Sequence, residues 1–263
     1  MHGSAAQVML TTMTELAAAV PRYRVIPFHL AMACVFALIA FAGFVPSYWS
    51  RVAAGTFTGA PIYHVHGLLL FGWTCLYLAQ TALVASGRTR RHRAWGMAGI
   101  AWFSVMICST VGLVIHSMRA AQALGAQVVE AALPISVVSF ITIALVSGLF
   151  AAAIANVSQP EVHKRLMVLV MVVLLQAAVA RLVVLPLSPA GPPSIQTTVV
   201  TGVVSDLLVV VAMAYDWRTR GRPHSVYVWG GMLLLGVQVV LGPLIARSDA
   251  AAAFAQSVQH LLD

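Results

Sequence analysis

Charged residues are scarce in this 263-residue sequence: Asp, Glu, Lys and Arg make up 8% of it, whereas 60% of it is apolar. Soluble domains carry roughly 25% charged residues, so there are too few charges here to cover a water-exposed surface. Disordered chains are excluded as well, because they combine low hydrophobicity with high net charge. The composition therefore predicts an integral membrane protein whose surface is largely covered by lipid.

Cysteine pairs and the common catalytic motifs are also missing. Cys34, Cys75 and Cys108 lie inside apolar stretches without a CxxC pair, which argues against a disulfide framework or a zinc site and predicts small buried side chains. The sequence contains no P-loop, GxGxxG or GxSxG motif, so nucleotide-binding and acyl-transfer enzymes have no support. HExxH and Glu-x-x-His pairs are missing too, which argues against a zinc protease or a di-iron site.

Long apolar segments are abundant. Each is long enough to cross about 30 Å of hydrocarbon as a helix, and Pro and Gly separate them. The seven segments lie near residues 26–45, 62–85, 95–117, 134–155, 165–186, 197–215 and 225–245. We therefore expect an all-α integral membrane protein with a bundle of about seven transmembrane helices over residues 26–245. Residues 1–25 and 246–263 are expected to be interfacial segments.

The net charge of +8 comes from fifteen basic and seven acidic residues. In a soluble protein this excess would suggest a nucleic-acid partner, but in a membrane protein basic residues collect at the cytoplasmic ends of the helices. A cytoplasmic N-terminus places most of them on the cytoplasmic side, and we therefore predict a cytoplasmic N-terminus, an outside C-terminus and no nucleic-acid partner. The cytoplasmic side then holds Arg22, Arg24, Arg88, Arg90, Arg91, Arg93, Lys164, Arg165, Arg218, Arg220 and Arg222, against Arg51, Arg119 and Arg247 outside.

Arg181 and Asp206 are the two charged residues that lie well inside apolar segments, and we therefore expect them at membrane depth. At 1.5 Å per residue, Arg181 lies about 24 Å along the fifth segment and Asp206 about 14 Å along the sixth. Pairing would lower the cost of burying both charges. Two interpretations stay open: a structural ion pair, and two groups on the pathway of a small transporter or proton-coupled carrier.

Nine histidines occur, and one group of them lies on the predicted outer side. His64 and His66 begin the second apolar segment, and His116 ends the third. His66 shares one helix face with Leu70, Trp73, Tyr77 and Gln80, and we expect this face to point into the bundle. Imidazoles at matched depth on neighbouring helices suit haem b or a transition metal. The alternative is that these histidines only form hydrogen bonds between helices.

A second group of histidines lies on the predicted cytoplasmic side, each within a basic helix-end segment: 88–96, 160–167 and 216–224. Helix N-termini and Arg side chains both favour anions, so these segments predict binding of an anionic lipid headgroup or another phosphate-bearing ligand. Asp216 would neutralise part of this charge, and ordinary positive-inside distribution is the alternative. The candidate residues are His92, Arg93, His163, Lys164, Arg165, Arg222, His224 and Asp216.

The order of these motifs resembles a group of bacterial multi-pass inner-membrane proteins that are classified in domain-of-unknown-function families. The resemblance covers roughly residues 60–232 and rests on HxH at 64–66, HRxxG at 92–96, HKRLM at 163–167 and GRxH at 221–224. It implies a location in the bacterial inner (cytoplasmic) membrane and no particular activity. It singles out His66, His92, His163, Arg181 and His224.

Three functions stay open at this point. The leading hypothesis is a haem- or metal-binding redox module that uses His66 with His116, His64 and Arg181 near the outer face. The second is a small transporter or proton-coupled carrier with Arg181 and Asp206 in its pathway. The third is a structural or assembly factor without a small ligand.

Overall fold

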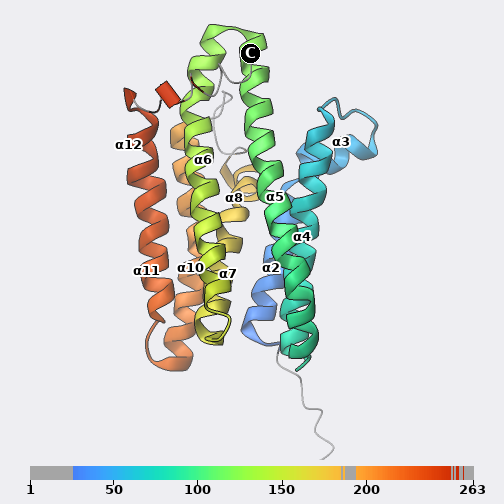
Figure 1. Ribbon diagram of the computed structural model, residues 1–263, viewed down its shortest axis with the longest axis vertical. Coiled ribbons are helices and arrows are strands. Elements are labelled where there is room, and N and C mark those ends of the chain that lie inside the picture. The colour runs from blue at the N-terminus through green and yellow to red at the C-terminus, as the bar shows by residue number, and fades with distance from the viewer. Residues whose placement is uncertain are drawn as a thin grey trace, which may run out of the picture.

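The chain folds into long helices that run side by side along one axis (Figure 1). The computed structural model describes residues 26–184, 186, 194–249, 251, 253, 254 and 257, and these residues form no strand. The expected interfacial segment at 1–25, and most of the one at 246–263, lie outside the described residues. The elements are α2 (Phe28–Gly43), η1 (Val45–Trp49), α3 (Ser50–Ala53), α4 (Pro61–Ala85), α5 (Thr89–Leu124), α6 (Ala126–Ala155), α7 (Pro160–Leu174), α8 (Gln176–Val179), η2 (Ala180–Val184), α10 (Ile195–Arg220), α11 (Ser225–Leu235), η3 (Gly236–Leu241) and α12 (Gly242–Ala246).

Within the described residues, six helical stretches are long and apolar enough to cross a membrane, and a bent pair would make a seventh. The bent pair joins Pro160–Leu174 to Gln176–Val183 at an angle of 41°. The predictions of an all-α fold and of multiple spanning helices are therefore confirmed. The orientation of the termini stays a prediction.

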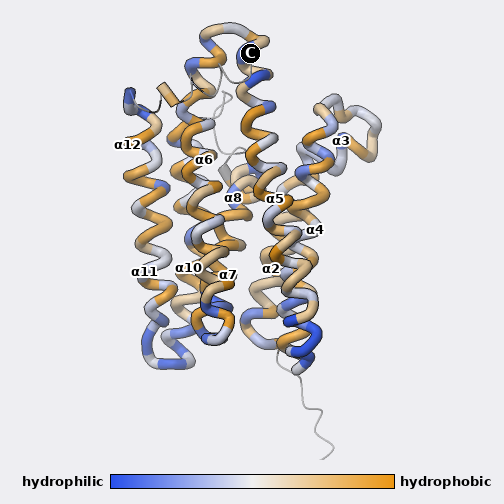
Figure 2. Tube along the Cα trace, in the orientation of Figure 1, coloured by the Kyte–Doolittle hydropathy of each residue, from blue (hydrophilic) through white to orange (hydrophobic). Residues whose placement is uncertain are grey.

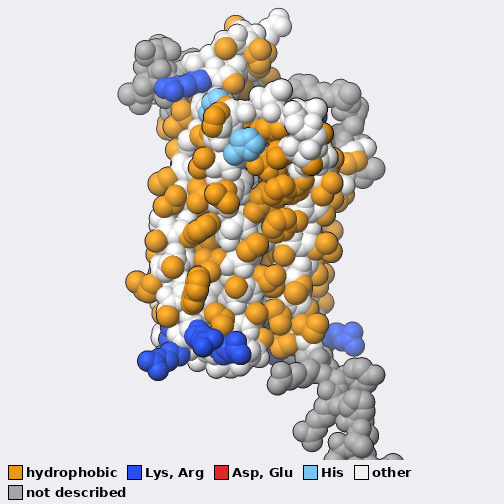
Figure 3. Space-filling model, turned by 90° about the vertical axis from the view of Figure 1, so that its right-hand side faces the viewer, with side chains coloured by type: hydrophobic (Ala, Val, Ile, Leu, Met, Phe, Trp, Pro, Cys, Tyr) orange, Lys and Arg blue, Asp and Glu red, His pale blue; other side chains and the backbone are white. Residues whose placement is uncertain are grey.

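The loops between α4 and α5, α6 and α7, and α10 and α11 lie at one end of the bundle (Figure 1). We call this the basic end and define it as residues 86–93, 156–165 and 216–224. Hydrophilic residues concentrate at this end in Figure 2, and Figure 3 shows Lys and Arg there below a broad band of apolar side chains. The α5–α6 turn and α3 lie at the opposite end (Figure 1).

The core centres on α7, which contacts α6, α10 and α11. Every residue from Val168 to Val173 is at most 3% exposed, so this stretch is enclosed on all sides. Glycines allow neighbouring helices to approach closely. A Cβ on Gly43 of α2 would overlap the backbone of Ala178 on α8, and one on Gly230 of α11 would overlap the Leu169 side chain.

In the part of the chain that the structure describes, three π-helices interrupt the spans, and a proline lies in or just after each one. Pro46 lies within η1, whereas Pro186 and Pro243 follow η2 and η3 by two residues. Proline cannot donate a backbone hydrogen bond, and its ring clashes with the carbonyl four residues earlier. A locally wider helical turn avoids this clash, and such π-turns are frequent at functional sites.

The cysteines differ from expectation. Cys34, Cys75 and Cys108 are all free and exposed, so the prediction that they are buried is wrong. They lie on outward faces of α2, α4 and α5, where a small apolar side chain is equally suited to contact with lipid.

Candidate functional site

A buried ion pair joins α7 to α10 at the basic end. Arg165 is 2% exposed and Asp216 is 1% exposed. The Arg165 guanidinium donates from Nε to Asp216 Oδ2 at 2.9 Å and from Nη2 to Asp216 Oδ1 at 2.6 Å. This bidentate geometry is the strongest form of such a pair, and it satisfies charges that would be costly to bury alone.

The pair belongs to a wider group of charges, which we call the ionic network and define as Glu161, Lys164, Arg165, Asp216 and Arg220. Glu161 Oε2 accepts from Arg165 Nη1 and from Arg220 Nη1, each at 2.7 Å. Glu161 Oε1 accepts from Lys164 Nζ at 2.6 Å. The network therefore connects the first turn of α7 to the last turns of α10 by two separate ion pairs.

The start of α11 is attached to the same network. The backbone N–H of His224 donates to Asp216 Oδ2 at 3.1 Å, and His224 Nδ1 accepts from the Val226 N–H at 3.2 Å, which caps the helix. Partial burial, and then the positive charges of Arg165 and Arg220, lower the pKa of His224. The ring is therefore neutral near pH 7, as its accepting role at the cap requires.

The structure brings most of the expected anion-binding residues together, but it pairs their charges with one another. Arg165 and Lys164 are bound to carboxylates, so they are not free to bind an external anion. His163 Nδ1 donates to the Ala153 carbonyl oxygen at 2.8 Å and joins α7 to α6. Arg93 and Arg222 are exposed and outside the network; anion binding stays a prediction for these two.

Several buried polar atoms near the ionic network have no hydrogen-bond partner among the described residues. The His92 ring lies 6.4 Å from that of His163, and Gln80 Nε2 donates to the His92 carbonyl oxygen at 3.2 Å. The Tyr227 ring lies 5.6 Å from the Arg165 guanidinium carbon. The atoms that lack a partner are His29 Nε2, Gln80 Oε1, His92 Nδ1 and Tyr227 Oη.

Arg181 and Asp206 are not joined in the ion pair that was one expectation. Arg181 lies in η2, where its Nε donates to Ser47 Oγ at 3.1 Å and its Nη1 donates to the Ala177 carbonyl oxygen at 2.7 Å. Its guanidinium carbon lies 4.4 Å from the Phe44 ring centroid. The bend after α7 and the π-turn that follows direct Arg181 toward α2 and η1 rather than toward α10.

Asp206 instead lies buried in the middle of α10, at 6% exposure. Neither of its carboxylate oxygens has a hydrogen-bond partner within the described part of the chain. Gln238 of η3 lies close to Asp206, and its amide nitrogen and oxygen are buried without partners too. Its side chain occupies the space beside Gly202, one turn from Asp206. Gln176 Nε2 on α8 is a further buried polar atom without a partner. We call Gln176, Asp206 and Gln238 the mid-span polar layer.

The outer histidines each have a partner of their own. Tyr48 Oη lies 2.8 Å from His64 Nδ1, and His66 Nδ1 lies 3.3 Å from Ser109 Oγ. The His116 ring packs edge-on against Tyr63, with 5.7 Å between the ring centroids. No group of three or more His, Cys, Asp or Glu side chains that could hold a metal ion occurs in the parts of the chain that the structure describes.

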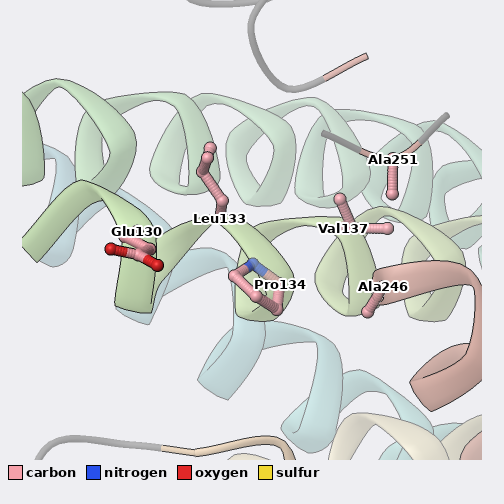
Figure 4. Close-up of a pocket in the computed structure, with 6 residues that line it drawn as sticks. All are labelled: Glu130, Leu133, Pro134, Val137, Ala246 and Ala251. Carbon is pink, nitrogen blue, oxygen red and sulfur yellow. The ribbon is translucent and has the colours of Figure 1, made fainter. Parts of the chain in front are cut away.

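A pocket of about 170 Å³ lies at the opposite end of the bundle (Figure 4). It is lined mainly by apolar side chains of α6 and α12, with Glu130 at its edge. The lining residues are Glu130, Leu133, Pro134, Val137, Ala246 and Ala251. This pocket contains none of the residues of the ionic network or of the mid-span polar layer.

Searches of family models, curated proteins and solved structures found no match to this chain. Sequence reasoning missed the pairing of Arg165 with Asp216 and the polar layer around Asp206. The available signal was spacing: Gln176 and Gln238 follow Arg165 and Tyr227 by eleven residues, which is close to three helical turns.

Proposed function

We propose that this protein is a proton-coupled membrane carrier in which Asp206 takes up and releases the proton. The observation that carries the proposal is the burial of the Asp206 carboxyl at mid-span with no partner on either oxygen among the described residues. An ionised carboxylate at that depth is costly, and ionisable groups there mark ion or proton pathways in membrane proteins. Protonation removes the charge, so uptake of a proton and burial of the side chain are coupled.

The helix breaks around Asp206 support a carrier. The bend at Leu175, the π-helix η2 and the π-helix η3 all interrupt helices that contact α10. Interrupted helices at membrane depth leave backbone groups available to a substrate or ion, and transporters build their binding sites from them. In this arrangement Gln238 is the polar group beside Asp206 that is available to a substrate, and Gln176 lies on α8, which contacts α10.

A carrier fits the structure better than a haem- or metal-binding redox module. The redox hypothesis needs His66 and His116, with His64, to face a common centre. Each of these rings instead contacts a different residue, Ser109, Tyr63 or Tyr48.

We further propose that the basic end faces the cytoplasm of a bacterial cell, with the protein in the inner membrane. The support is the positive-inside rule and the gathering of Lys and Arg side chains at that end (Figure 3). Exposed Arg93 and Arg222 would then contact anionic lipid headgroups. The variant Thr219→Cys, at an exposed position, should react with an impermeant maleimide in inside-out vesicles and not in right-side-out vesicles. The reverse result would contradict this orientation.

The carrier proposal is tested in energised inside-out vesicles, with a quenched dye that reports the pH gradient. We would add a panel of sodium and potassium salts, amino acids, sugars, amines and carboxylates. At least one class should dissipate the gradient in vesicles with the wild-type protein, and Asp206→Asn should abolish the effect. Asp249→Asn, which neutralises an exposed acid in the same chain, is the matched control and should leave it unchanged. The proposal is overturned if no class acts on wild-type vesicles, or if Asp206→Asn behaves as wild type.

A further inference from the structure

The mid-span polar layer is carried by three helical stretches, and each of them also has a residue in the ionic network or beside it. The first stretch contributes Arg165 and Gln176, and α10 contributes Asp216 and Asp206. The third stretch, α11 with η3, contributes Gln238 to the polar layer, and its Tyr227 ring lies beside the Arg165 guanidinium of the network. Each pair is ten or eleven residues apart, which is about 15 Å along a helix.

An apolar layer fills this distance. We call it the apolar plug and define it as Leu169 and Val172 of α7, Val209 and Ala212 of α10, and Leu234 of α11. Each of these side chains is at most 2% exposed. Leu169 fits against Gly230 so closely that a Cβ there would overlap its Cδ1 atom. The contact leaves no room for water between α7 and α11 at this level.

The ionic network holds the three helices together directly below the plug. Arg165 to Asp216 and Glu161 to Arg220 tie α7 to α10. The bond from the His224 N–H to Asp216 ties in α11. The plug can therefore open only when the network opens, because α7 cannot move away from α10 and α11 while the two ion pairs hold.

We propose that the ionic network and the apolar plug form a gate that closes the route between the basic end and Asp206. This proposal rests on the carrier function proposed above and adds how access to its proton site is controlled. The gate opens when Arg165 separates from Asp216 and both charges enter water at the basic end. Hydration of both groups then compensates for the loss of their mutual attraction. If only one group entered water, the other would be left as a buried charge without a partner.

The break in the fifth span supplies the hinge for this movement. Leu175, at the 41° bend, follows the plug residues of α7 directly. A bend at a helix end allows the segment before it to tilt as a rigid body. Tilting of α7 about Leu175 would withdraw Leu169 from Gly230 and move Arg165 away from Asp216 together.

The gate is tested by thiol labelling in lipid nanodiscs, in a background where Cys34, Cys75 and Cys108 are replaced by Ser. Ala212→Cys places the thiol in the plug, between Asp206 and the basic end. We expect slow reaction with a water-soluble maleimide, and reaction at least tenfold faster when Asp216→Asn is added. The matched reporter is Thr201→Cys, which lies on the other side of Asp206 in the same helix and should react at an unchanged rate.

The outcomes separate the gate from unfolding and from the carrier proposal. A variant that fails to fold accelerates labelling at both positions. In that case the double variant Arg165→Met with Asp216→Leu is the deciding measurement, because it keeps the packing and has no charges that could enter water. In this double variant, the labelling rate of Ala212→Cys should stay slow. Fast labelling there overturns the gate, and so does a labelling rate that Asp216→Asn leaves unchanged. Labelling needs no substrate, so a wild-type protein that moves no protons but shows the expected labelling overturns the carrier function only.

Discussion

Arg165 shows how this chain accommodates a full charge in a nearly closed environment. Its guanidinium makes two bonds to Asp216 and two to Glu161, and the Tyr227 ring lies beside it. Taking two charges out of water is costly, and only good geometry with additional hydrogen bonds compensates for the cost. Asp206 presents the opposite situation, since it is also buried, at 6% exposure, but neither of its carboxylate oxygens has a hydrogen-bond partner among the described residues.

This contrast gives a prediction at the scale of single residues. Asp216→Ala should lower the free energy of unfolding by about 3–5 kcal/mol, because it leaves the buried Arg165 charge without its partner. Lys164→Ala should cost less than about 1 kcal/mol, since its pair with Glu161 is exposed to solvent and screened. Unfolding of the two variants in matched detergent, followed by tryptophan fluorescence, measures both. Equal losses would show that burial of the Arg165 pair does not set its contribution.

At the scale of elements, the positions of the helices could be predicted because each depends on a simple property of its own sequence. A run of apolar residues bounded by Pro or Gly is sufficient to place α4 and α10, whereas α6 begins eight residues before the expected segment because Pro134 lies within the helix. The relation between elements depends on helix rotation and on the π-turns, which shift the faces of the residues that follow. Arg181 illustrates this limit: its depth was predictable, whereas its contact with Ser47 depends on the break at Leu175 and on η2.

The close contact between α2 and α8 gives a prediction at this scale. Gly43→Val should lower the free energy of unfolding by about 1–3 kcal/mol, because the new side chain would overlap the backbone of Ala178, which cannot rotate away. Gly148→Val is the matched control in another spanning helix, since no atom lies within 4 Å of the position of its Cβ. Thermal unfolding in detergent compares the two, and a control as unstable as Gly43→Val would rule out packing as the cause.

At the scale of the whole molecule, polar groups collect at defined levels of an otherwise apolar bundle. The candidate residues at the basic end were predictable as a set, because basic helix ends share one side of a membrane. The contacts that these residues make were not predictable, because the sequence does not show which carboxylate pairs with which guanidinium. Because the basic residues of the expected anion site pair with carboxylates, this site connects helices instead. Of the two charges expected at membrane depth, Arg181 has hydrogen-bond partners, whereas the Asp206 carboxylate has none among the described residues.

The last prediction concerns the redox hypothesis and the molecule as a whole. Purified protein should show no Soret band and should contain less than one equivalent of iron, copper or zinc. The reason is that His64, His66 and His116 contact Tyr48, Ser109 and Tyr63 instead of converging on one centre. Absorption spectra and metal analysis of detergent-purified protein, expressed with haem precursor and metal salts, make the measurement. A stoichiometric Soret band or metal that disappears in His66→Ala would instead require the outer ends of α4 and α5 to rearrange around a cofactor, and it would favour electron transfer over the carrier function.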